Sequence, residues 1–440
     1  MNRAKLISEN AVVIDNLDFI NDEILSLIGD ADFVLLGEAS HGTHEFYKYR
    51  AEITKKLIEE KQFSAVAVEA DFPDAYRVNR FVRGAGSDRT AEESLGDFKR
   101  FPLWMWRNTV ILEFIEWLKN HNDSLDKTDR IGFYGIDLYS LHSSIEAVLD
   151  YLNKTDPEAA RRAEYRYSCF DHFGEDPKHY GYAASFDLSK SCEAEVVNQL
   201  TELRKRAFAY INRDAFVARD EYFYAEQNAR LIKNAEQYYR QMFDRQISGW
   251  NLRDRHMTET ITSLAEHLQN QNRAKKIVVW AHNSHLGDAR ATDMSRRGDW
   301  NVGQLIREAY PQNSVNIGFT TFTGTVSAAD DWNEPVRLKK VNKAPENSFE
   351  RLFHDTKISR FFLNLRKETV GKTLREPLSE RAIGVIYRPQ TERVSHYFQA
   401  NLPRQFDGII HFDQTRAVEP LDKAASWSNE DLPETFPEGV

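Results

Sequence analysis

Six ionisable side chains follow short apolar runs that the sequence marks as strands. They are Glu38 and His41 after residues 33–37 (FVLLG), Glu69 after 65–68 (AVAV), Asp137 after 131–136 (IGFYGI), and His282 and His285 after 277–281 (IVVWA). In open parallel sheets the ligand crevice lies beyond the carboxyl ends of the strands, so we expect these residues to converge in one crevice. Carboxylates and imidazoles placed together are suited to general acid/base catalysis.

Each of these residues, taken singly, also fits an ordinary solvent-facing loop, where polar residues are common. Because an ionisable residue follows each of four strands, a functional site is favoured over four unrelated loops. Glu69 is the sharpest case, because a carboxylate seldom follows an uninterrupted apolar run without a partner or a task; its simpler interpretation is a buried ion pair with an arginine. We expect His282 and His285 on a loop, with Asn283 and Ser284 forming a tight turn between them.

Two chemistries remain open at this crevice. Two histidines with two glutamates can bind zinc or a similar ion, although the sequence has no HExxH-type spacing. The same residues are equally suited to acid/base work on water. A serine nucleophile is disfavoured, because Ser40 precedes His41 without the context of a GxSxG elbow.

Weaker candidates flank the crevice. Arg50 lies on a helix that begins near Thr43, about two turns beyond His41, so it could reach the crevice as a carboxylate partner or an oxyanion donor. A solvated helix arginine is equally compatible with the pattern. The segment FPLWMWRN forms either a core anchor or an apolar wall for a bulky substrate. Its candidate substrate-binding residues, together with Asp137, are Trp104, Trp106, Arg107 and Asn108.

The elements that position these residues alternate between apolar strands and helix-patterned stretches, which predicts βαβ units around a parallel sheet. We therefore expect an α/β fold: a three-layer α/β/α arrangement with a mostly parallel central sheet and a large helical insertion. Residues 1–154 and 273–440 would form the two parts of the core. Residues 155–272 would be the insertion that covers the cleft, with an apolar helical stripe from Tyr224 to Met242.

Finer predictions concern the later segments. Further strands are expected at residues 315–319, 382–387 and 408–411, and a hairpin or loop near the sheet edge after Thr320. Residues 172–182 (HFGEDPKHYGY) have no period and predict a loop.

Composition narrows the class of protein. The chain of 440 residues has 58 Lys and Arg against 68 Asp and Glu, a formal charge of −10, which argues against binding nucleic acid. With 41% hydrophobic residues it is globular rather than disordered. No apolar run reaches membrane-spanning length, so we expect no membrane or targeting segment. Cys169 and Cys192 are too few for a disulfide scaffold, and we expect inert thiols in a reducing cytoplasm.

Several motifs together resemble those of the erythromycin esterase family. They are GEASHGTHEFYKYR, VEADFPDAYRVNRFV, FPLWMWRN, YGIDLYS and VVWAHNSHLGD, and their order agrees over most of the chain. The resemblance implies that a histidine activates water to hydrolyse a lactone, without a metal or other cofactor and without a covalent intermediate. Carried over to this sequence, the family's site residues fall on Glu38, the general base His41, Arg50, Glu69, His282 and His285.

The resemblance has one departure. Where the family pattern would be RDxxMAxN, this chain has RDRHMTET (residues 253–260), so the insertion could accept a different substrate. Some relatives are labelled succinoglycan biosynthesis proteins, and hydrolysis is therefore a firmer expectation than macrolide hydrolysis. The leading hypothesis is a hydrolase acting on a small-molecule ester or lactone. The alternatives are a metal-dependent hydrolase that uses the same residues, and a non-catalytic module that binds haem or a similar ligand.

Overall fold

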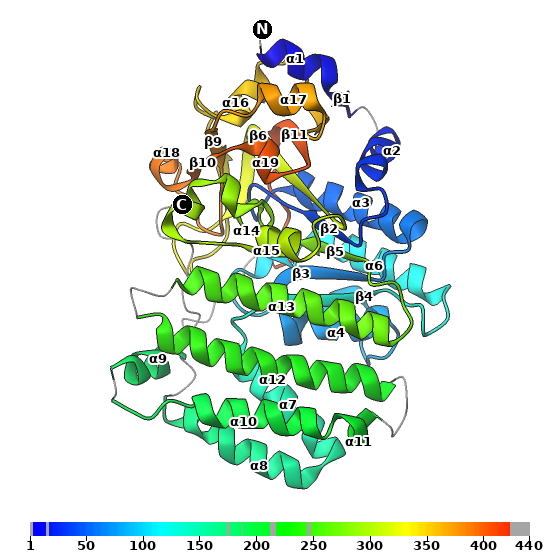
Figure 1. Ribbon diagram of the computed structural model, residues 1–440, viewed down its shortest axis with the longest axis vertical. Helices are drawn as coiled ribbons and strands as arrows, with labels where there is room; N and C mark the ends of the chain where they lie inside the picture. The colour runs from blue at the N-terminus through cyan, green and yellow to red at the C-terminus, as the bar shows by residue number, and fades with distance from the viewer. Residues whose placement is uncertain are drawn as a thin grey trace.

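The centre of the molecule is a mostly parallel β-sheet with helices on both faces (Figure 1). The computed structural model describes residues 3–14, 17–173, 177–186, 188–211, 217–243 and 248–422. Within these residues the main sheet has nine strands. Its spatial order is β1 (Val12–Val13), β8 (Arg360–Asn364), β11 (Gly408–Thr415), β6 (Ser314–Ala328), β2 (Phe33–Leu36), β5 (Ile277–Trp280), β3 (Ala65–Asp71) and β4 (Gly132–Asp137), with β7 (Arg337–Val341) pairing with β6.

The strand pairings confirm the α/β class. All pairs from β11 to β4 are parallel, whereas β1–β8, β8–β11 and β6–β7 are antiparallel. The predicted strands at residues 33–37, 65–68, 131–136, 277–281, 315–319 and 408–411 coincide with six of these strands. The hairpin expected after Thr320 is the β6–β7 pair. A second, two-stranded sheet consists of β9 (Leu378–Arg381) and β10 (Tyr397–Ala400).

The helices follow in chain order. The α-helices before the helical insertion are α1 (Arg3–Asn10), α2 (Leu17–Ile28), α3 (His44–Lys61), α4 (Phe72–Val82), α5 (Ala91–Ser94), α6 (Thr109–Asp123) and α7 (Leu141–Thr155). Those of the insertion are α8 (Pro157–Tyr167), α9 (Pro177–Ser185), α10 (Glu193–Lys205), α11 (Ala207–Ile211), α12 (Val217–Gln241) and α13 (Gly249–Asn270). The remainder are α14 (Asn283–Leu286), α15 (Val302–Ala309), α16 (Phe349–His354), α17 (Glu368–Thr373), α18 (Glu392–Ser395) and α19 (Leu402–Gln405), with 3-10 turns η1 (Leu103–Met105), η2 (Ser168–Phe173), η3 (Ala289–Ala291) and η4 (Asp293–Arg297).

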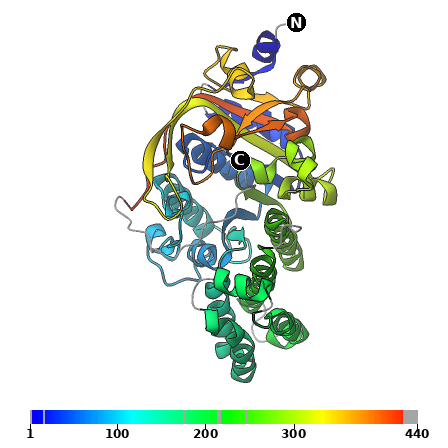
Figure 2. The same cartoon turned by 90° about the vertical axis from the view of Figure 1, so that its left-hand side faces the viewer.

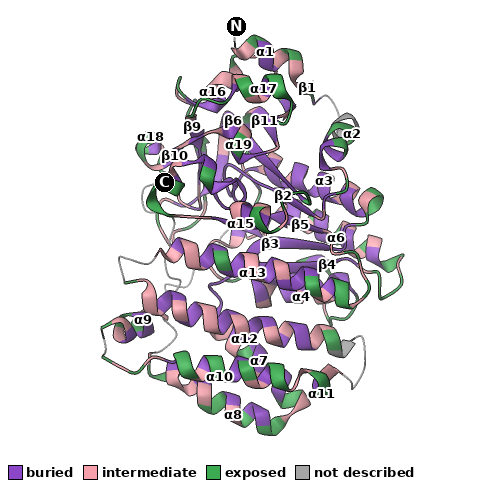
Figure 3. Ribbon diagram, in the orientation of Figure 1, coloured by how far each residue is buried: buried purple, intermediate pink, exposed green. Residues whose placement is uncertain are grey.

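The two faces of the sheet are covered by separate hydrophobic clusters, because successive strand residues point to opposite faces. In β2, Val34 and Leu36 pack with residues of α3 and α6. Phe33 and Leu35 pack on the other side with residues of α13 and α15. The central strands β2, β3, β4 and β5 are therefore buried throughout, whereas β1, β7 and β8 also have exposed residues. Many of the other exposed residues lie on the outer helices (Figure 3).

The helical insertion extends the molecule beyond the β4 edge of the sheet. Helices α13, α12, α10 and α8 are stacked one below another at that end (Figure 1), and the perpendicular view shows the insertion at the same end of the molecule (Figure 2). Helix α13 packs directly against β4 and also contacts α15, whereas α12 reaches β4 through the ring of Phe223 on Tyr134. Of the insertion, α13 is therefore placed to reach the carboxyl ends of the strands.

Two local predictions are wrong. Residues 382–387 form no strand; Ile383 makes an isolated bridge to Ser40 instead, and its N–H donates to the carbonyl of Ala39 at 2.8 Å. This segment is apolar because it packs against the turn that carries His41. Residues 172–182 are not a loop, because the described part continues η2 to Phe173 and begins α9 at Pro177.

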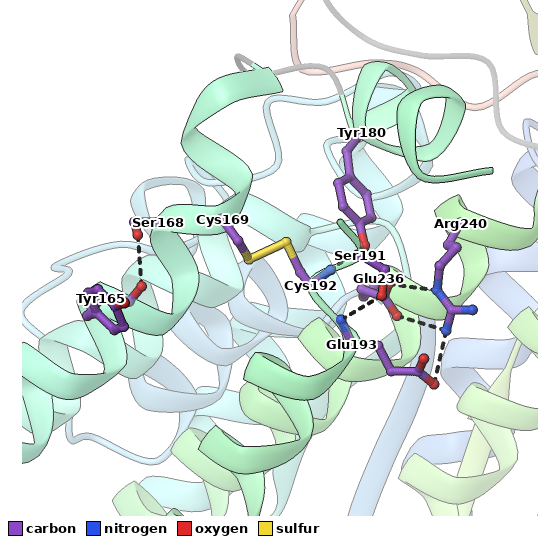
Figure 4. Close-up of a disulfide and its surroundings, with 9 residues drawn as sticks. All are labelled: Tyr165, Ser168, Cys169, Tyr180, Ser191, Cys192, Glu193, Glu236 and Arg240. Carbon is purple, nitrogen blue, oxygen red and sulfur yellow. Dashed lines mark hydrogen bonds and ion pairs between the residues drawn. A yellow bond between two sulfur atoms is a disulfide. The ribbon is translucent and has the colours of Figure 1, made fainter. Parts of the chain in front are cut away.

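The expectation of two inert thiols is also wrong. Cys169 and Cys192 form a disulfide, with their Cα atoms 5.9 Å apart (Figure 4). The Cys192 N–H donates to the hydroxyl of Tyr180, which donates to Glu236 on α12. The bridge therefore joins η2 to the start of α10 within the insertion. Among the described residues, none of the helices combines the length and apolar character that crossing a bilayer requires.

The disulfide gives the first testable prediction. It spans 23 residues of sequence, so losing it should destabilise the insertion by about 3 kcal/mol through the added entropy of the unfolded chain. Cys169→Ser should lower the midpoint of thermal unfolding, whereas Ser168→Ala should not. Oxidised protein unfolded without reductant should bind no maleimide and should bind two after reduction. Two reactive thiols before reduction would contradict the pairing.

Candidate active site

The strand ends lie in register across the centre of the sheet. Leu36 and Val68 both pair with Trp280, and Val68 also pairs with Gly135. The residues one or two positions further along each strand are the predicted ionisable ones. Parallel pairing therefore brings Glu38, Glu69, Asp137 and His282 to one edge, as the sequence predicted.

A bulge in β3 adjusts this edge. The pairing with β4 shifts from Val68–Gly135 to Asp71–Asp137, so β3 contains one extra residue. As a result three successive residues, 69–71, line the same cavity, which a regular strand would not allow. Gly135 is required opposite the bulge, because a Cβ there would lie 2.4 Å from the carbonyl oxygen of Asp71.

The first group of site residues is a buried chain of Arg50, Glu38 and His41. His41 Nδ1 lies 2.9 Å from Glu38 Oε1, and Arg50 Nη2 donates to Glu38 Oε2 at 2.8 Å. Arg50 is fully buried, with its guanidinium over the rings of Tyr47 and Trp280 at 4.4 and 5.3 Å. The interpretation of Arg50 as a solvent-exposed helix arginine is therefore excluded. Because the carboxylate accepts from Nδ1–H, the basic nitrogen of a neutral His41 is Nε2.

The second group is centred on Arg253, which reaches the strand ends from α13. Its Nη2 donates to Glu69 Oε1 at 2.8 Å and to Asp137 Oδ2 at 2.7 Å, and its Nε donates to Asp137 Oδ1 at 2.9 Å. Burial alone would raise the pKa of Glu69, but the charges of His285 and Arg253 hold it well below its usual value. Glu69 thus has the buried arginine partner that its simpler interpretation required, and it lies in the cluster as well.

His285 lies between two carboxylates, which favour its protonated form. Its Nδ1 lies 2.9 Å from Asp254 Oδ2, and its Nε2 lies 3.3 Å from Glu69 Oε1. The ring stacks on Trp250 with centroids 4.2 Å apart. Burial by itself would lower the pKa of His285, but the carboxylates of Asp254 and Glu69 outweigh it and raise the pKa from 6.5 to about 9.

His282 has the opposite protonation. Burial holds the pKa of His282 well below its usual value, and the charge of His41 lowers it further, so the ring is neutral. The backbone N–H of Ser284 donates to His282 Nδ1 at 3.2 Å. Nδ1 is therefore an acceptor and the proton lies on Nε2. That buried Nε2–H has no hydrogen-bond partner among the described residues, and the ring centroids of His282 and His41 are 5.0 Å apart.

The turn around these two histidines differs from the expected loop. His282 is the N-cap of the short helix α14, and His285 lies within that helix. Asn283 fixes the turn to β6, because its Nδ2 donates to the carbonyl of Phe319 at 2.8 Å. Glu69 Oε2 accepts the backbone N–H of His282 at 2.9 Å. The strand end of β3 thus positions the turn after β5.

A small cavity opens beside both groups, and we call it the strand-end cavity. Its volume is about 40 Å³, enough for a few water molecules. Its ionisable lining residues are His41, Glu69, Asp71, Asp74, Arg100, Asp137 and Arg253. Its apolar wall is Ala70 with Phe98, Phe101, Pro102, Leu103, Met105 and Trp106. His41 therefore faces a space that can hold water.

The predicted substrate-binding residues divide between the cavity and the core. Trp106 and Asp137 line the cavity, whereas Trp104 is buried in the core and is absent from its lining. Arg107 pairs with Asp422 at 2.6 Å, near the end of the described chain. Asn108 caps α6 by accepting from the N–H groups of Val110 and Ile111. The structure thus places Arg107 and Asn108 in structural contacts away from the cavity.

Sequence reasoning missed Arg253 and Asp254 as site residues. They were noticed only as part of the motif RDRHMTET, because a charged pair on a helix ordinarily faces solvent. Both are buried here, with exposed fractions of 1% and 0%. An Arg-Asp pair inside the apolar face of α13 was the available signal. Among the described residues, no three His, Cys, Asp or Glu side chains are arranged as a set that could hold a metal ion.

The fold and site together define an α/β protein whose buried acid–histidine pairs lie at the carboxyl ends of the central strands. Comparison with known proteins supplies the family. The erythromycin esterase family model matches residues 58–415, so the chain belongs to the erythromycin esterase family. Erythromycin esterase type II of Escherichia coli is 23% identical over 427 residues, covering 92% of this chain and 94% of that protein.

Solved structures share the fold. A structure described as a succinoglycan biosynthesis protein superposes with a TM-score of 0.77 at 22% identity, covering 95% of this chain and 98% of that one. A mutant of the erythromycin esterase EreC in its open conformation gives a TM-score of 0.64 at 16% identity, covering 95% and 96% of the two chains.

The two ion pairs of His285, with Asp254 and Glu69, give a second prediction. Because its folded pKa of about 9 exceeds the unfolded value of 6.5, its stabilisation is fully present below pH 6.5 and is lost as pH rises through about 9. The contribution is at most about 3 kcal/mol. The wild-type midpoint of thermal unfolding should therefore fall between pH 6.5 and 9.5 more steeply than that of His285→Gln. If the midpoints of the two proteins fall with pH at the same slope, His285 is not protonated in the folded state.

Proposed function

We propose that the protein hydrolyses a carboxylic ester or lactone with water activated by His41, without a covalent intermediate. The observation that carries this proposal is the position of His41, which faces the strand-end cavity while its Nδ1 is bonded to Glu38. Glu38 fixes the tautomer and stabilises the imidazolium that forms, and Arg50 holds Glu38 in place. His41 Nε2 then takes a proton from water as the water attacks the ester carbon.

The two later histidines supply a hydrogen-bond donor and a positive charge. His282 Nε2–H is a buried donor without a partner among the described residues, and it lies on the ring that faces His41. It is suited to donate to the oxyanion that develops on the carbonyl oxygen. The imidazolium of His285 and the guanidinium of Arg253 add fixed positive charge behind it. The leaving alkoxide then receives a proton from His41.

The comparisons support the class of substrate. One relative carries the name erythromycin esterase, and the family model carries the same name. We therefore propose a bulky, largely apolar ester or lactone such as a macrolide. Its apolar part would contact the wall formed by residues 98–106, with Trp106 in place of the predicted pair of tryptophans.

A bulky substrate requires the cavity to widen. At about 40 Å³ the cavity admits water but no ester of that size, whereas ligand pockets usually measure roughly 300–1,000 Å³. Among the described residues of the insertion, Arg253 alone lines the cavity. We propose that the insertion covers the cleft, moves with α13 to admit substrate, and returns to complete the site. A solved family structure described as open supports such a movement.

The third prediction concerns His41. His41→Asn should lower hydrolysis by ~10²- to 10⁴-fold, because it removes the general base, while the folded state persists. His121→Asn is the matched control, since His121 lies on α6 against Trp117 and far from the chemistry. Both variants should be checked by circular dichroism. Activity of a folded His41→Asn within a few-fold of the wild type would refute the assignment.

The assay should use a substrate panel running from short p-nitrophenyl esters to macrolides of two ring sizes, with products identified by mass. Turnover of a macrolide with the gain of one water supports the esterase. Efficient turnover of only the smallest esters would refute the bulky-substrate proposal. Turnover by the wild type and not by His41→Asn links the activity to this site rather than to a contaminant.

The fourth prediction separates the proposal from a metal-dependent hydrolase. Dialysis against a strong chelator should leave the rate of hydrolysis unchanged, because the proposed chemistry uses a histidine base and hydrogen-bond donors. Metal content measured on the same sample establishes that removal succeeded. Loss of activity that zinc or manganese specifically restores would replace this mechanism with the metal-dependent one.

A further inference from the structure

The strand-end cavity has more acids than the proposed chemistry uses. Four carboxylates line it, Glu69, Asp71, Asp74 and Asp137, against the two arginines Arg100 and Arg253. With all four acids ionised and His41 left aside, the formal charge of the lining would be −2, from two positive and four negative groups. Arg253 is committed to Glu69 and Asp137. The surplus negative charge thus lies at the outer end, with Asp71 and Asp74.

Asp71 holds an unused acceptor at this end. Its Oδ2 accepts from Arg100 Nε at 2.9 Å, whereas its Oδ1 has no hydrogen-bond partner among the described residues. The residue is only 8% exposed. A buried carboxylate oxygen without a partner costs free energy, so this position is suited to a ligand that supplies an N–H donor. The β3 bulge places Asp71 in the cavity lining.

Asp74, one turn into α4, strengthens this negative end. It forms no ion pair or hydrogen bond in the part of the chain that the structure describes, and it lines the same cavity. Burial raises the pKa of Asp74 well above its usual value, and the neighbouring Asp71 carboxylate raises it further. Arg100 and Lys99 only partly offset that repulsion. The raised pKa favours the protonated form of Asp74 in the empty cavity. A cation bound between the two carboxyl groups would take the place of that proton and relieve the repulsion.

We infer that the outer end of the strand-end cavity, formed by Asp71 and Asp74, binds a protonated amine on the ester substrate. The inference rests on the proposed function and narrows its substrate class to aminoalkyl esters. The lining carries the surplus charge that a cation neutralises and the free acceptor that an N–H satisfies. The adjacent Phe98, Phe101 and Pro102 would contact the alkyl groups on the nitrogen.

The chemistry favours an organic cation over a metal ion. Divalent metals take several oxygen ligands, and no three acidic or histidine side chains among the described residues are arranged to hold one. One of the two carboxylates is already paired with Arg100. A single N–H donor flanked by alkyl groups matches one free oxygen beside an apolar wall.

Matched pairs of esters test this subsite. 3-(Dimethylamino)propyl acetate and 4-methylpentyl acetate have the same shape and differ in replacing a protonated N–H by C–H, as do 2-(dimethylamino)ethyl acetate and 3-methylbutyl acetate. A tertiary amine is chosen because it cannot capture the acyl group. Acetate release at pH 7 gives kcat and KM. We expect the wild type to prefer the amine by roughly tenfold or more in KM, the effect of one charge-assisted hydrogen bond.

Asp71→Asn and Asp74→Asn should reduce that preference toward one. Glu113→Gln is the control for net charge, because Glu113 is exposed on α6 and outside the cavity lining; its preference should match that of the wild type. Equal KM values for the amine and its isostere in the wild type would overturn the subsite while leaving the esterase intact. An unchanged preference in both Asp variants would overturn it as well. A variant that fails to fold is replaced by Asp→Ser at the same position, which also removes the charge.

Binding separates the subsite from the hydrolysis. 3-(Dimethylamino)propan-1-ol and 4-methylpentan-1-ol, the product alcohols, can be compared by calorimetry without any turnover. If no ester is hydrolysed but the amine alcohol binds more tightly and loses that advantage in Asp71→Asn, the subsite stands and the proposed function fails. If neither alcohol binds in preference to the other and no ester pair is distinguished, the subsite is refuted.

Discussion

The buried guanidinium of Arg253 is the interaction on which the site depends. It binds the carboxylates that end β3 and β4, lies 3.1 Å from His285 Nε2, and belongs to the helix that joins the insertion to the sheet. Removing it would leave Asp137 buried without a counter-charge and Glu69 with His285 alone. Breaking a buried ion pair in this way typically costs about 3–5 kcal/mol. One side chain therefore sets the charge of the cluster and fixes α13 against the strand ends.

That charge distribution explains how two histidines three residues apart differ. His285 lies between Asp254 and Glu69 and keeps a proton, whereas His282 faces another histidine and lies in a buried environment that disfavours charge. The α14 turn exposes each ring to a different set of neighbours. The proposed mechanism uses this difference, because a fixed cation and a neutral N–H donor can act together only where their pKa values are separated.

The same geometry relates chemistry to substrate access. The Glu38–His41–Arg50 chain belongs to the core and is supported by Ile383 and Tyr47, so it stays in place if the insertion moves. In the part of the insertion that the structure describes, Arg253 is the single residue that lines the cavity. Movement of α13 would thus open the cavity and also withdraw positive charge from Glu69 and His285. On the proposed function, closure over the substrate would restore the charge that the reaction needs.

The sequence by itself determined the features that depend on neighbouring residues in the chain. Apolar runs predicted the central strands, and parallel pairing then required Glu38, Glu69, Asp137 and His282 to meet, because strands in register end together. For Arg50 the sequence left a carboxylate partner, an oxyanion donor and a solvated helix arginine all open. The family resemblance added the general-base role, which remains a proposal.

Only the tertiary structure decided the contacts that join distant segments. Arg253 is 184 residues from Glu69, and no local pattern distinguishes a buried helix arginine from a solvated one. The disulfide depends on η2 and α10 packing together, and residues 382–387 are apolar because they support the His41 turn rather than a sheet. The protonation of His282 and His285 was undecidable for the same reason: burial and neighbouring charge set a pKa, and both exist only once the chain has folded.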